Sequence, residues 1–419
     1  MLCVRKSSGD ELISIPLEEV SDVRSVKRRI ARVYRVSRFR QKLVHGATVL
    51  EDDIQIDEPM DVTLSLLHWA TDSWERRNEL VDAAEDGLLV DVELMLQRPQ
   101  NPNCPDQRDT LPLTMAASQG HADVVSLLLE AAADPSGQGD QAVYCAAGPG
   151  YTEIVQLLLD AHADTDFVDN QGDTALTCAA RNGHTKIVRR LLQTRARGTN
   201  HALPCAVAEG HSSIVRLLLH AGANQNFPDA YGVPSLVLAA NGGYHDILEL
   251  LLQFGADKDS ACTSGFTALI RASHQGHVSI VRALLQSKAA VNAATLNMDT
   301  ALMRAAGQGQ MEVVRLLLAA GADRDAVSHN GDTALIRAAC NARLDVVRLL
   351  LQAGADKNLA SNNGETALSR AQRKGHKEVE RLLSEDAPAD LDDDSDPPEM
   401  NDIRGECEEG LGLVAPDSK

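Results

Sequence analysis

A tripeptide that returns every 33 residues limits the folds open to this chain more than any other feature. Thr-Ala-Leu occurs five times, and its last four copies are separated by 33 residues each. Weaker copies at the same or slightly shorter spacing extend the series to ten units. The units start at Asn78, Leu111, Gln141, Thr174, His201, Pro234, Thr267, Thr300, Thr333 and Thr366. Such a period indicates small modules stacked in a row rather than one domain with a single core.

Each unit predicts two short helices followed by a turn. Counting from the Thr as position 0, Leu at +2 and Ala at +5 and +6 share one face of the first helix. Nine of the ten units have Gly at +9, a residue suited to the left-handed conformation that ends many helices. Residues 311–319, MEVVRLLLA, illustrate the amphipathic second helix. Segments such as AGADRDAVSHNGD then predict a hairpin-like turn.

This order of helices and hairpins resembles the ankyrin repeat. The stretches GHTKIVRRLLQ, GHSSIVRLLLHAGAN and GHVSIVRALL carry the resemblance, which covers residues 78–386. It implies a mostly α solenoid with a concave protein-binding groove. The usual Thr-Pro-Leu-His of that family is Thr-Ala-Leu followed by another residue here, so contacts between repeats are expected to be looser. The connection before His201 is six residues short and should interrupt the row of hairpins.

Residues 1–67 do not follow the 33-residue period. MLCVRK and ELISIPL predict a hairpin, and a helix is expected from Ser21 or Asp22, with an apolar stripe of Val23, Val26, Ile30 and Val33. QKLVHGATVL and DVTLSLL predict two further strand regions. The order and the LVHGATVLEDD stretch resemble the ubiquitin-like (β-grasp) fold, a small α+β domain. The resemblance places Val44 in a recognition patch, and residues 68–77 are expected to be a linker.

The charge of the chain is strongly uneven. The formal net charge is -20, whereas residues 1–67 carry eleven basic and eleven acidic side chains. Residues 385–419 carry thirteen acids against two bases, and a disordered acidic tail is expected over 387–419. The tail is either a solubilising end or a segment that acts on a partner or on this chain. The basic helix near residues 24–35 is either a solvated face or a docking surface for an acidic partner, the tail included.

The residues capable of catalysis or metal binding do not converge in a recognisable motif. Cys145, Cys178 and Cys205 share position +4, and repeats about 10 Å apart are too distant for disulfides. His274 and His277 form H-x-x-H, but His277 is simply the residue that follows the repeat's Gly. No phosphate loop, nucleophile elbow or HExxH pair is present in the sequence. We therefore expect no enzyme, no metal and no cofactor.

Position +4 also carries four successive arginines, Arg271, Arg304, Arg337 and Arg370. In the ankyrin family this position lines the groove, and four arginines there suggest acidic ligands, although packing or duplication of repeats explains them equally well. The side chains at +8 that flank them are Gln275, Gln308, Asn341 and Lys374. Asn358, in LLQAGADKN, resembles asparagines that are hydroxylated in ankyrin proteins, but Asn is also an ordinary turn residue.

These features favour a non-enzymatic scaffold or adaptor that binds other proteins, some through acidic peptides, while its N-terminal domain recruits ubiquitin-pathway components or the proteasome. The alternative is a regulatory or substrate-recognition subunit of a ubiquitin ligase complex. The acidic charge argues against nucleic acid as a ligand. The sequence shows no signal peptide and no apolar run of about 20 residues. We expect a monomer in the cytoplasm or nucleus, without membrane contact.

Overall fold

The computed structural model describes residues 1–70, 73–136 and 141–384. These residues divide into two units. Unit 1 comprises residues 1–209 and 220–222, and unit 2 comprises residues 210–219 and those from 223 onward. The predicted disordered tail, 387–419, lies outside the described residues.

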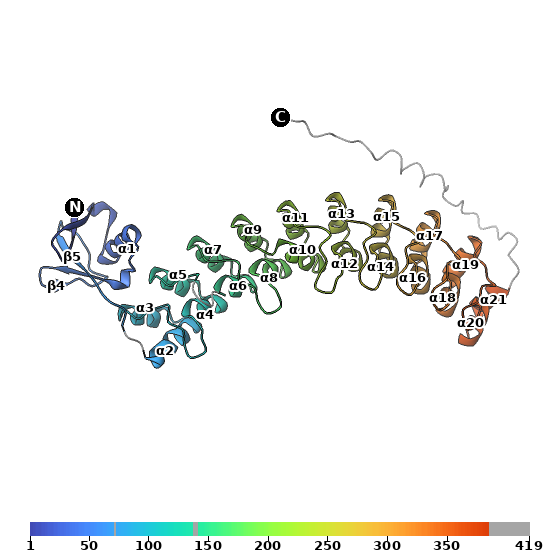
Figure 1. The fold of residues 1–419 in the computed structure, drawn as a ribbon, viewed down its shortest axis with the longest axis horizontal. Helices are drawn as coiled ribbons and strands as arrows, with labels where there is room; N and C mark the ends of the chain where they lie inside the picture. Colours follow the sequence, from blue (N-terminus) through green and yellow to red (C-terminus); the bar gives the residue numbers. More distant parts are fainter. Residues whose placement is uncertain (71–72, 137–140, 385–419) are drawn as a thin grey trace, which may run out of the picture. The chain divides into compact units, whose positions relative to one another are not determined.

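Unit 1 begins with a five-stranded mixed sheet in the order β2-β1-β5-β3-β4 (Figure 1). Strands β1 and β5 are parallel, and the other neighbouring pairs are antiparallel. The segment 41–50, predicted as one strand region, folds into two strands because Gly46, at φ 60°, allows a tight turn between them. The strands are β1 (Leu2–Lys6), β2 (Glu11–Ile15), β3 (Gln41–His45), β4 (Thr48–Val49) and β5 (Asp61–Leu66).

Helix α1 (Val23–Tyr34) packs on this sheet. It begins where the sequence predicts, because the Asp22 carboxylate accepts a hydrogen bond of 2.7 Å from the backbone N–H of Ser25. Three residues of the predicted stripe join the core of the sheet, but Val33 is 52% exposed. Val33, the last residue of the predicted stripe, is not part of the buried cluster.

Helix pairs follow the sheet in unit 1 and make up unit 2 (Figure 1). Helix α2 starts at Trp74, inside the predicted 68–77 linker. The sequence pattern does not indicate this start, because the polar first turn, WERR, has no apolar periodicity. In unit 1 the helices are α2 (Trp74–Glu85), α3 (Leu89–Gln97), α4 (Pro112–Gln119), α5 (Ala122–Glu130), α6 (Ala142–Ala147), α7 (Thr152–Asp160), α8 (Ala175–Arg181), α9 (Thr185–Gln193) and α10 (Thr199–Ala208).

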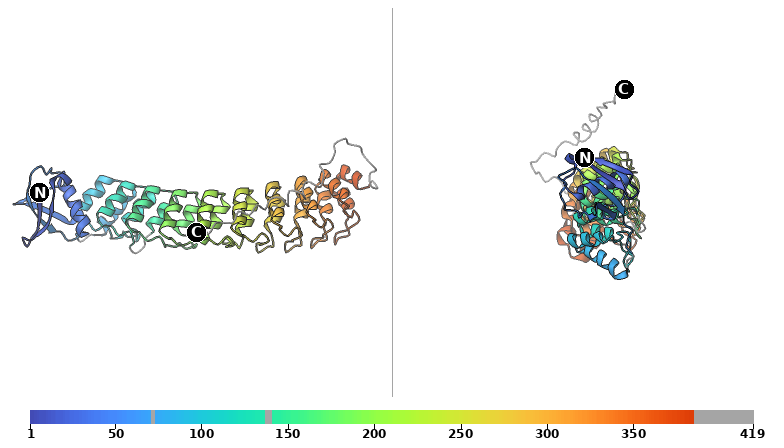
Figure 2. Two further views of the ribbon diagram at one scale, coloured as in Figure 1. Left: turned by 90° about the horizontal axis from the view of Figure 1, so that it is seen from above. Right: turned by 90° about the vertical axis from the view of Figure 1, so that its left-hand side faces the viewer.

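Unit 2 continues the same pattern. Its helices are most of α11 (Ser212–His220), then α12 (Ser235–Gly242), α13 (His245–Gln253), α14 (Ala268–Gln275), α15 (Val278–Gln286), α16 (Ala301–Gln308), α17 (Met311–Ala319), α18 (Ala334–Cys340), α19 (Leu344–Gln352), α20 (Ala367–Lys374) and α21 (Lys377–Ser384). Helices α14, α16, α18 and α20 pack side by side in one layer, and α15, α17, α19 and α21 in a second (Figure 1). The helices of this unit follow one another in chain order, from green to red (Figure 2).

The repeated Thr and Gly mark the two ends of helices α14, α16 and α20. Thr300 caps helix α16, because its hydroxyl accepts a hydrogen bond of 3.3 Å from the N–H of Met303. Gly309 ends the same helix at φ 84°, which confirms the predicted left-handed position. The small residues between them, Ala305 and Ala306, are completely buried and let neighbouring helices approach closely. The 33-residue period therefore combines a cap, a packing face and a stop.

Adjacent repeats are tied together by side chains that follow the repeat's Gly. Nε2 of His376 lies 3.1 Å from the carbonyl oxygen of Cys340 in the preceding repeat. His184 makes the same contact with Gly148 at 2.9 Å, and His121 with Glu85 at 2.9 Å. The predicted loosening between repeats is thus offset, because a histidine at position +10 bonds to the neighbouring backbone. Before α10 the connection spans only residues 194–198, too short for a hairpin like the others.

Candidate partner-binding surface

The hairpins that precede the first helices of unit 2 are joined to one another by backbone hydrogen bonds. The N–H of Leu296 donates to the carbonyl of Ser264 at 3.2 Å, and the N–H of His329 donates to Asn297 at 2.9 Å. The close approach depends on Gly265, since a Cβ there would lie 2.8 Å from the backbone nitrogen of Leu296. A side chain at this position would push the two hairpins apart, so Gly265 helps to build a continuous row.

Large apolar side chains project from this row into solvent. The exposed fraction is 83% for Tyr231, 72% for Leu296, 52% for Met298 and 49% for Val327. Each belongs to the segment between one helix pair and the next. Exposed apolar groups gathered on neighbouring hairpins are typical of protein contact surfaces. The sequence pattern does not mark these residues as contact residues, because turn segments are expected to vary and to face water.

The four arginines at position +4 lie one on each of α14, α16, α18 and α20. Three of them form ion pairs with carboxylates of the chain itself. The carboxylate of Asp299, whose side chain is only 5% exposed, lies 2.6 Å from Arg304 and also pairs with Arg337 of the next repeat. Arg370 pairs with Asp332 at 3.1 Å and with Glu365 at 2.8 Å. The arginines are therefore not one uniform row of available cations.

A sequence signal for these pairs exists. Asp299, Asp332 and Glu365 each stand immediately before the Thr of their repeat, at position -1. Asp173 has the same place before Thr174 and pairs with Arg181 at 2.7 Å. An acid at -1 lies beside the start of the first helix, within reach of arginines on that helix or the next. The basic positions taken alone do not reveal this series.

Arg271 differs from the other three arginines because position -1 of its repeat is Phe266. Its guanidinium carbon lies 3.9 Å from the centre of the Phe266 ring, and that of Arg304 lies 5.2 Å from the same centre. No ion pair of Arg271 is found within residues 1–70, 73–136 and 141–384. His274, on the next turn of α14, has a pKa lowered by its burial and by the charges of Arg304 and Arg271.

The remaining predicted site residues are mostly accessible. Gln275, Gln308 and Lys374 are exposed at the ends of their helices, and Nε2 of Gln275 donates to Oδ1 of Asn241 at 3.3 Å. Asn358 is exposed in a turn, where its N–H donates to the Asp356 carboxylate at 2.9 Å. This geometry fits a turn residue, and its hydroxylation stays a prediction. Val44 is half-buried on β3, opposite Val49 of β4.

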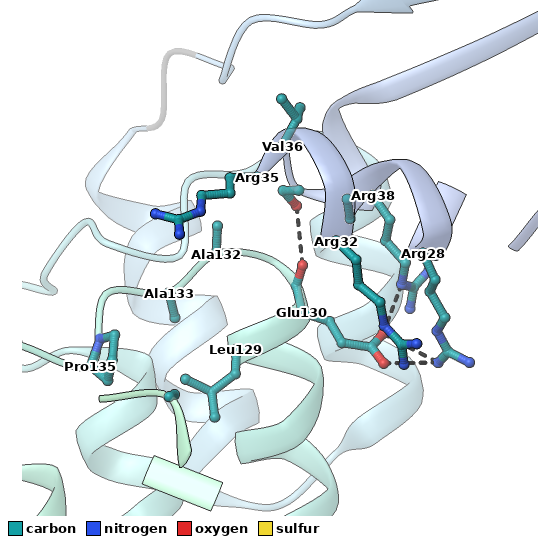
Figure 3. Close-up of a pocket in the computed structure, with 13 residues that line it drawn as sticks. Arg28, Arg32, Arg35, Val36, Arg38, Leu129, Glu130, Ala132, Ala133 and Pro135 are labelled. Carbon is teal, nitrogen blue, oxygen red and sulfur yellow. Dashed lines mark hydrogen bonds and ion pairs between the residues drawn. The ribbon is translucent and has the colours of Figure 1, made fainter. Parts of the chain in front are cut away.

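A hollow lies in unit 1, between α1 and the loop after α5 (Figure 3). Arg38, only 2% exposed, holds its edge: its guanidinium lies 2.9 Å from Asp52, 3.0 Å from Glu93 and 2.9 Å from Glu130. Arg28 also pairs with Glu130, at 2.9 Å. Much of the basic helix is thus matched by acids of its own domain and of the first repeats.

The described residues offer little for metal or disulfide chemistry. The seven cysteines found there, Cys145, Cys178 and Cys205 among them, form no disulfide. In the same part of the chain, no three His, Cys, Asp or Glu side chains are grouped to hold a metal ion. Nor does any of its helices combine the length and the apolar character that crossing a bilayer requires.

Helix pairs repeated at a fixed period and joined through hairpins define the class of helical repeat proteins, in which each repeat packs on its neighbours. The family model described as "Ankyrin repeats (3 copies)" matches residues 80–167, 143–229, 205–295, 236–326 and 288–361, which together cover more than half of the chain. The chain belongs to the ankyrin-repeat family. A comparison with curated proteins found no match.

Proposed function

We propose that this protein is a non-enzymatic scaffold that binds partner proteins along the hairpins and first helices of unit 2. The exposed apolar side chains of Leu296 and Met298, on a hairpin that is hydrogen-bonded to both of its neighbours, carry the proposal, and Tyr231 is a further exposed apolar side chain of the same unit. Ankyrin repeats are general protein-interaction modules, and a preformed surface loses little conformational entropy when a partner binds. Large apolar side chains at the centre of an interface commonly supply much of the affinity.

Affinity capture with the full chain tests this proposal. Replacing Leu296 and Met298 together by Ser should release a defined set of partners, because it removes the two neighbouring apolar tips. Val90→Ser is the matched control, since Val90 is 70% exposed on α3 of unit 1. The proposal fails if no protein is retained by the wild-type chain, or if the double variant and the control retain the same set.

We further propose that residues 1–67 form a ubiquitin-like domain that recruits ubiquitin-pathway or proteasome components. The strand order β2-β1-β5-β3-β4, with one helix between β2 and β3, supports this proposal. Val44 on β3 and the 40% exposed Val49 on β4 face each other across the strand pair, so they can form a small apolar contact patch.

Titration of the isotope-labelled full chain with a ubiquitin-interacting helical peptide tests the second part. We expect Val44→Ser to weaken binding by about tenfold, the loss of one apolar anchor. Val33→Ser, at an exposed site on α1, should leave affinity unchanged. If the peptide causes no chemical-shift changes in β3 and β4 of the wild-type chain, the proposed ubiquitin-like recruitment is refuted. Ubiquitin transfer by a complex that copurifies with the chain would instead favour the alternative, a substrate-recognition subunit of a ligase.

A further inference from the structure

The charges near Phe266 do not balance. Arg304 and Arg337 share the single carboxylate of Asp299, and Arg271 has no carboxylate partner within the described part of the chain. By contrast, Arg370 and Arg373 are matched by Asp332 and Glu365. The two arginines of α20 are therefore matched by carboxylates, whereas Arg271 of α14 is not.

Unused hydrogen-bonding atoms occur at the same place. Nδ1 of His274 and Nε of Arg304 are buried and have no hydrogen-bond partner among the described residues. Arg271 lies over the face of the Phe266 ring, which holds the guanidinium group in position without neutralising it. Because these two nitrogens are buried, a ligand makes its direct contact with the half-buried Arg271, and the charge of Arg304 adds to the attraction for an anion.

The other repeats indicate which ligand chemistry fits. Asp299 occupies position -1 of its repeat and accepts from Arg304, at +4 of the same repeat. The Phe at -1 leaves the corresponding place beside Arg271 without a carboxylate. A carboxylate from another molecule would restore the arrangement that the chain builds for itself one repeat later. Guanidinium–carboxylate pairs have matched planar geometry and charge-assisted hydrogen bonds.

We propose that Arg271, together with His274 and Arg304, binds an aspartate or glutamate side chain of a partner protein beside the ring of Phe266. The proposal rests on the interaction function proposed above and narrows the acidic-ligand hypothesis from four arginines to one anchor. Arg337 and Arg370 act instead as internal braces between repeats.

Fluorescence anisotropy with the full chain tests the anchor. The probe is a labelled peptide of alternating Asp and Leu, and the control peptide has Asn in place of Asp. Arg271→Gln should weaken binding of the acidic probe about tenfold, the loss of a charge-assisted hydrogen bond. Phe266→Asp should weaken it similarly, because it supplies an internal carboxylate as in the next repeat. Arg282→Gln, an exposed change on α15, is the charge-matched control and should have no effect.

Nuclear magnetic resonance of the His274 imidazole gives a second readout. A bound carboxylate offsets the neighbouring guanidinium charges, so the acidic peptide should raise the pKa of His274 and the Asn peptide should not. Wild-type affinity in both Arg271→Gln and Phe266→Asp would overturn the proposal. So would a tenfold gain on deletion of residues 385–419, since the chain's own tail would then be the occupant.

The two proposals fail in distinguishable ways. If the full chain captures no partner, the scaffold function fails whatever the peptide does. If the Leu296 and Met298 variant loses partners, the scaffold function stands. If, in addition, Arg271→Gln binds the same partners and the acidic peptide as tightly as the wild type, only the proposed role of Arg271 fails.

Discussion

Arg337 forms an ion pair with Asp299 of the preceding repeat, 38 residues earlier in the chain. Because Arg304 pairs with the same carboxylate, Asp299 joins two successive first helices, α16 and α18. A brace of this kind stabilises the contact between repeats, which is the interaction on which the cooperativity of a repeat array depends.

Replacement of Asp299 by Asn should therefore destabilise unit 2. It leaves two partly buried guanidinium groups without their counter-charge, and loss of one partner of a buried ion pair costs about 3 kcal/mol. Urea unfolding of the full chain, followed by circular dichroism, measures the change. Asp325→Asn is the control, because its 3.7 Å pair with Arg324 is at the surface and should contribute less than about 1 kcal/mol. Equal unfolding midpoints for the two variants would contradict the brace.

Arg38 should be among the most sensitive positions of unit 1. Arg38→Ala leaves Asp52, Glu93 and Glu130 close together without the guanidinium that neutralises them, and we expect a loss of about 3 kcal/mol. Limited proteolysis should then cleave near residues 68–73 faster than in the wild type. Arg35→Ala, an exposed change at the end of α1, provides the comparison. Cleavage at the wild-type rate in Arg38→Ala would show that the three carboxylates do not need the arginine.

The lowered pKa of His274 predicts a pH dependence. Below its ordinary pKa of 6.5 the unfolded chain takes up a proton that the folded chain resists, so stability falls as pH falls below that value. His274→Asn should remove this contribution to the dependence of stability on pH. Unfolding midpoints between pH 7.5 and 5.5 compare the two chains, with His329→Asn on a hairpin as control. A slope that is identical in wild type and His274→Asn would refute the assignment.

Ala342 offers a stabilising change. It occupies the repeat position where nine other repeats have Gly, and its φ of 56° is in the left-handed region. Ala342→Gly relieves this strain, and we expect a gain of about 0.5–1 kcal/mol after the larger backbone entropy of Gly is counted. Thermal and urea unfolding of the full chain measure it. Ala353→Gly, at the right-handed C-cap of α19, should not stabilise.

Local pattern was enough to predict most of the elements. The start of α1 at Asp22, the caps at Thr300 and Gly309 and the paired helices all follow from interactions between residues a few positions apart. The exposure of Val33 could not be predicted in this way, because burial depends on which residues distant in the sequence pack against the helix. The start of α2 at Trp74 could not be predicted either, because a polar helical turn has no apolar periodicity.

The sequence by itself determined the repeat, its helices and the positions of its arginines, since these are set by spacing and by short-range backbone preference. Only the tertiary structure decided which arginines are occupied. Arg38 meets Glu93 and Glu130 from 55 and 92 residues away, and Arg370 meets Asp332 from 38 residues away. Such pairs form only when packing brings together residues that are distant in the sequence. The same packing leaves Arg271 beside Phe266 without a carboxylate, which distinguishes it from three arginines that have the same place in the sequence pattern.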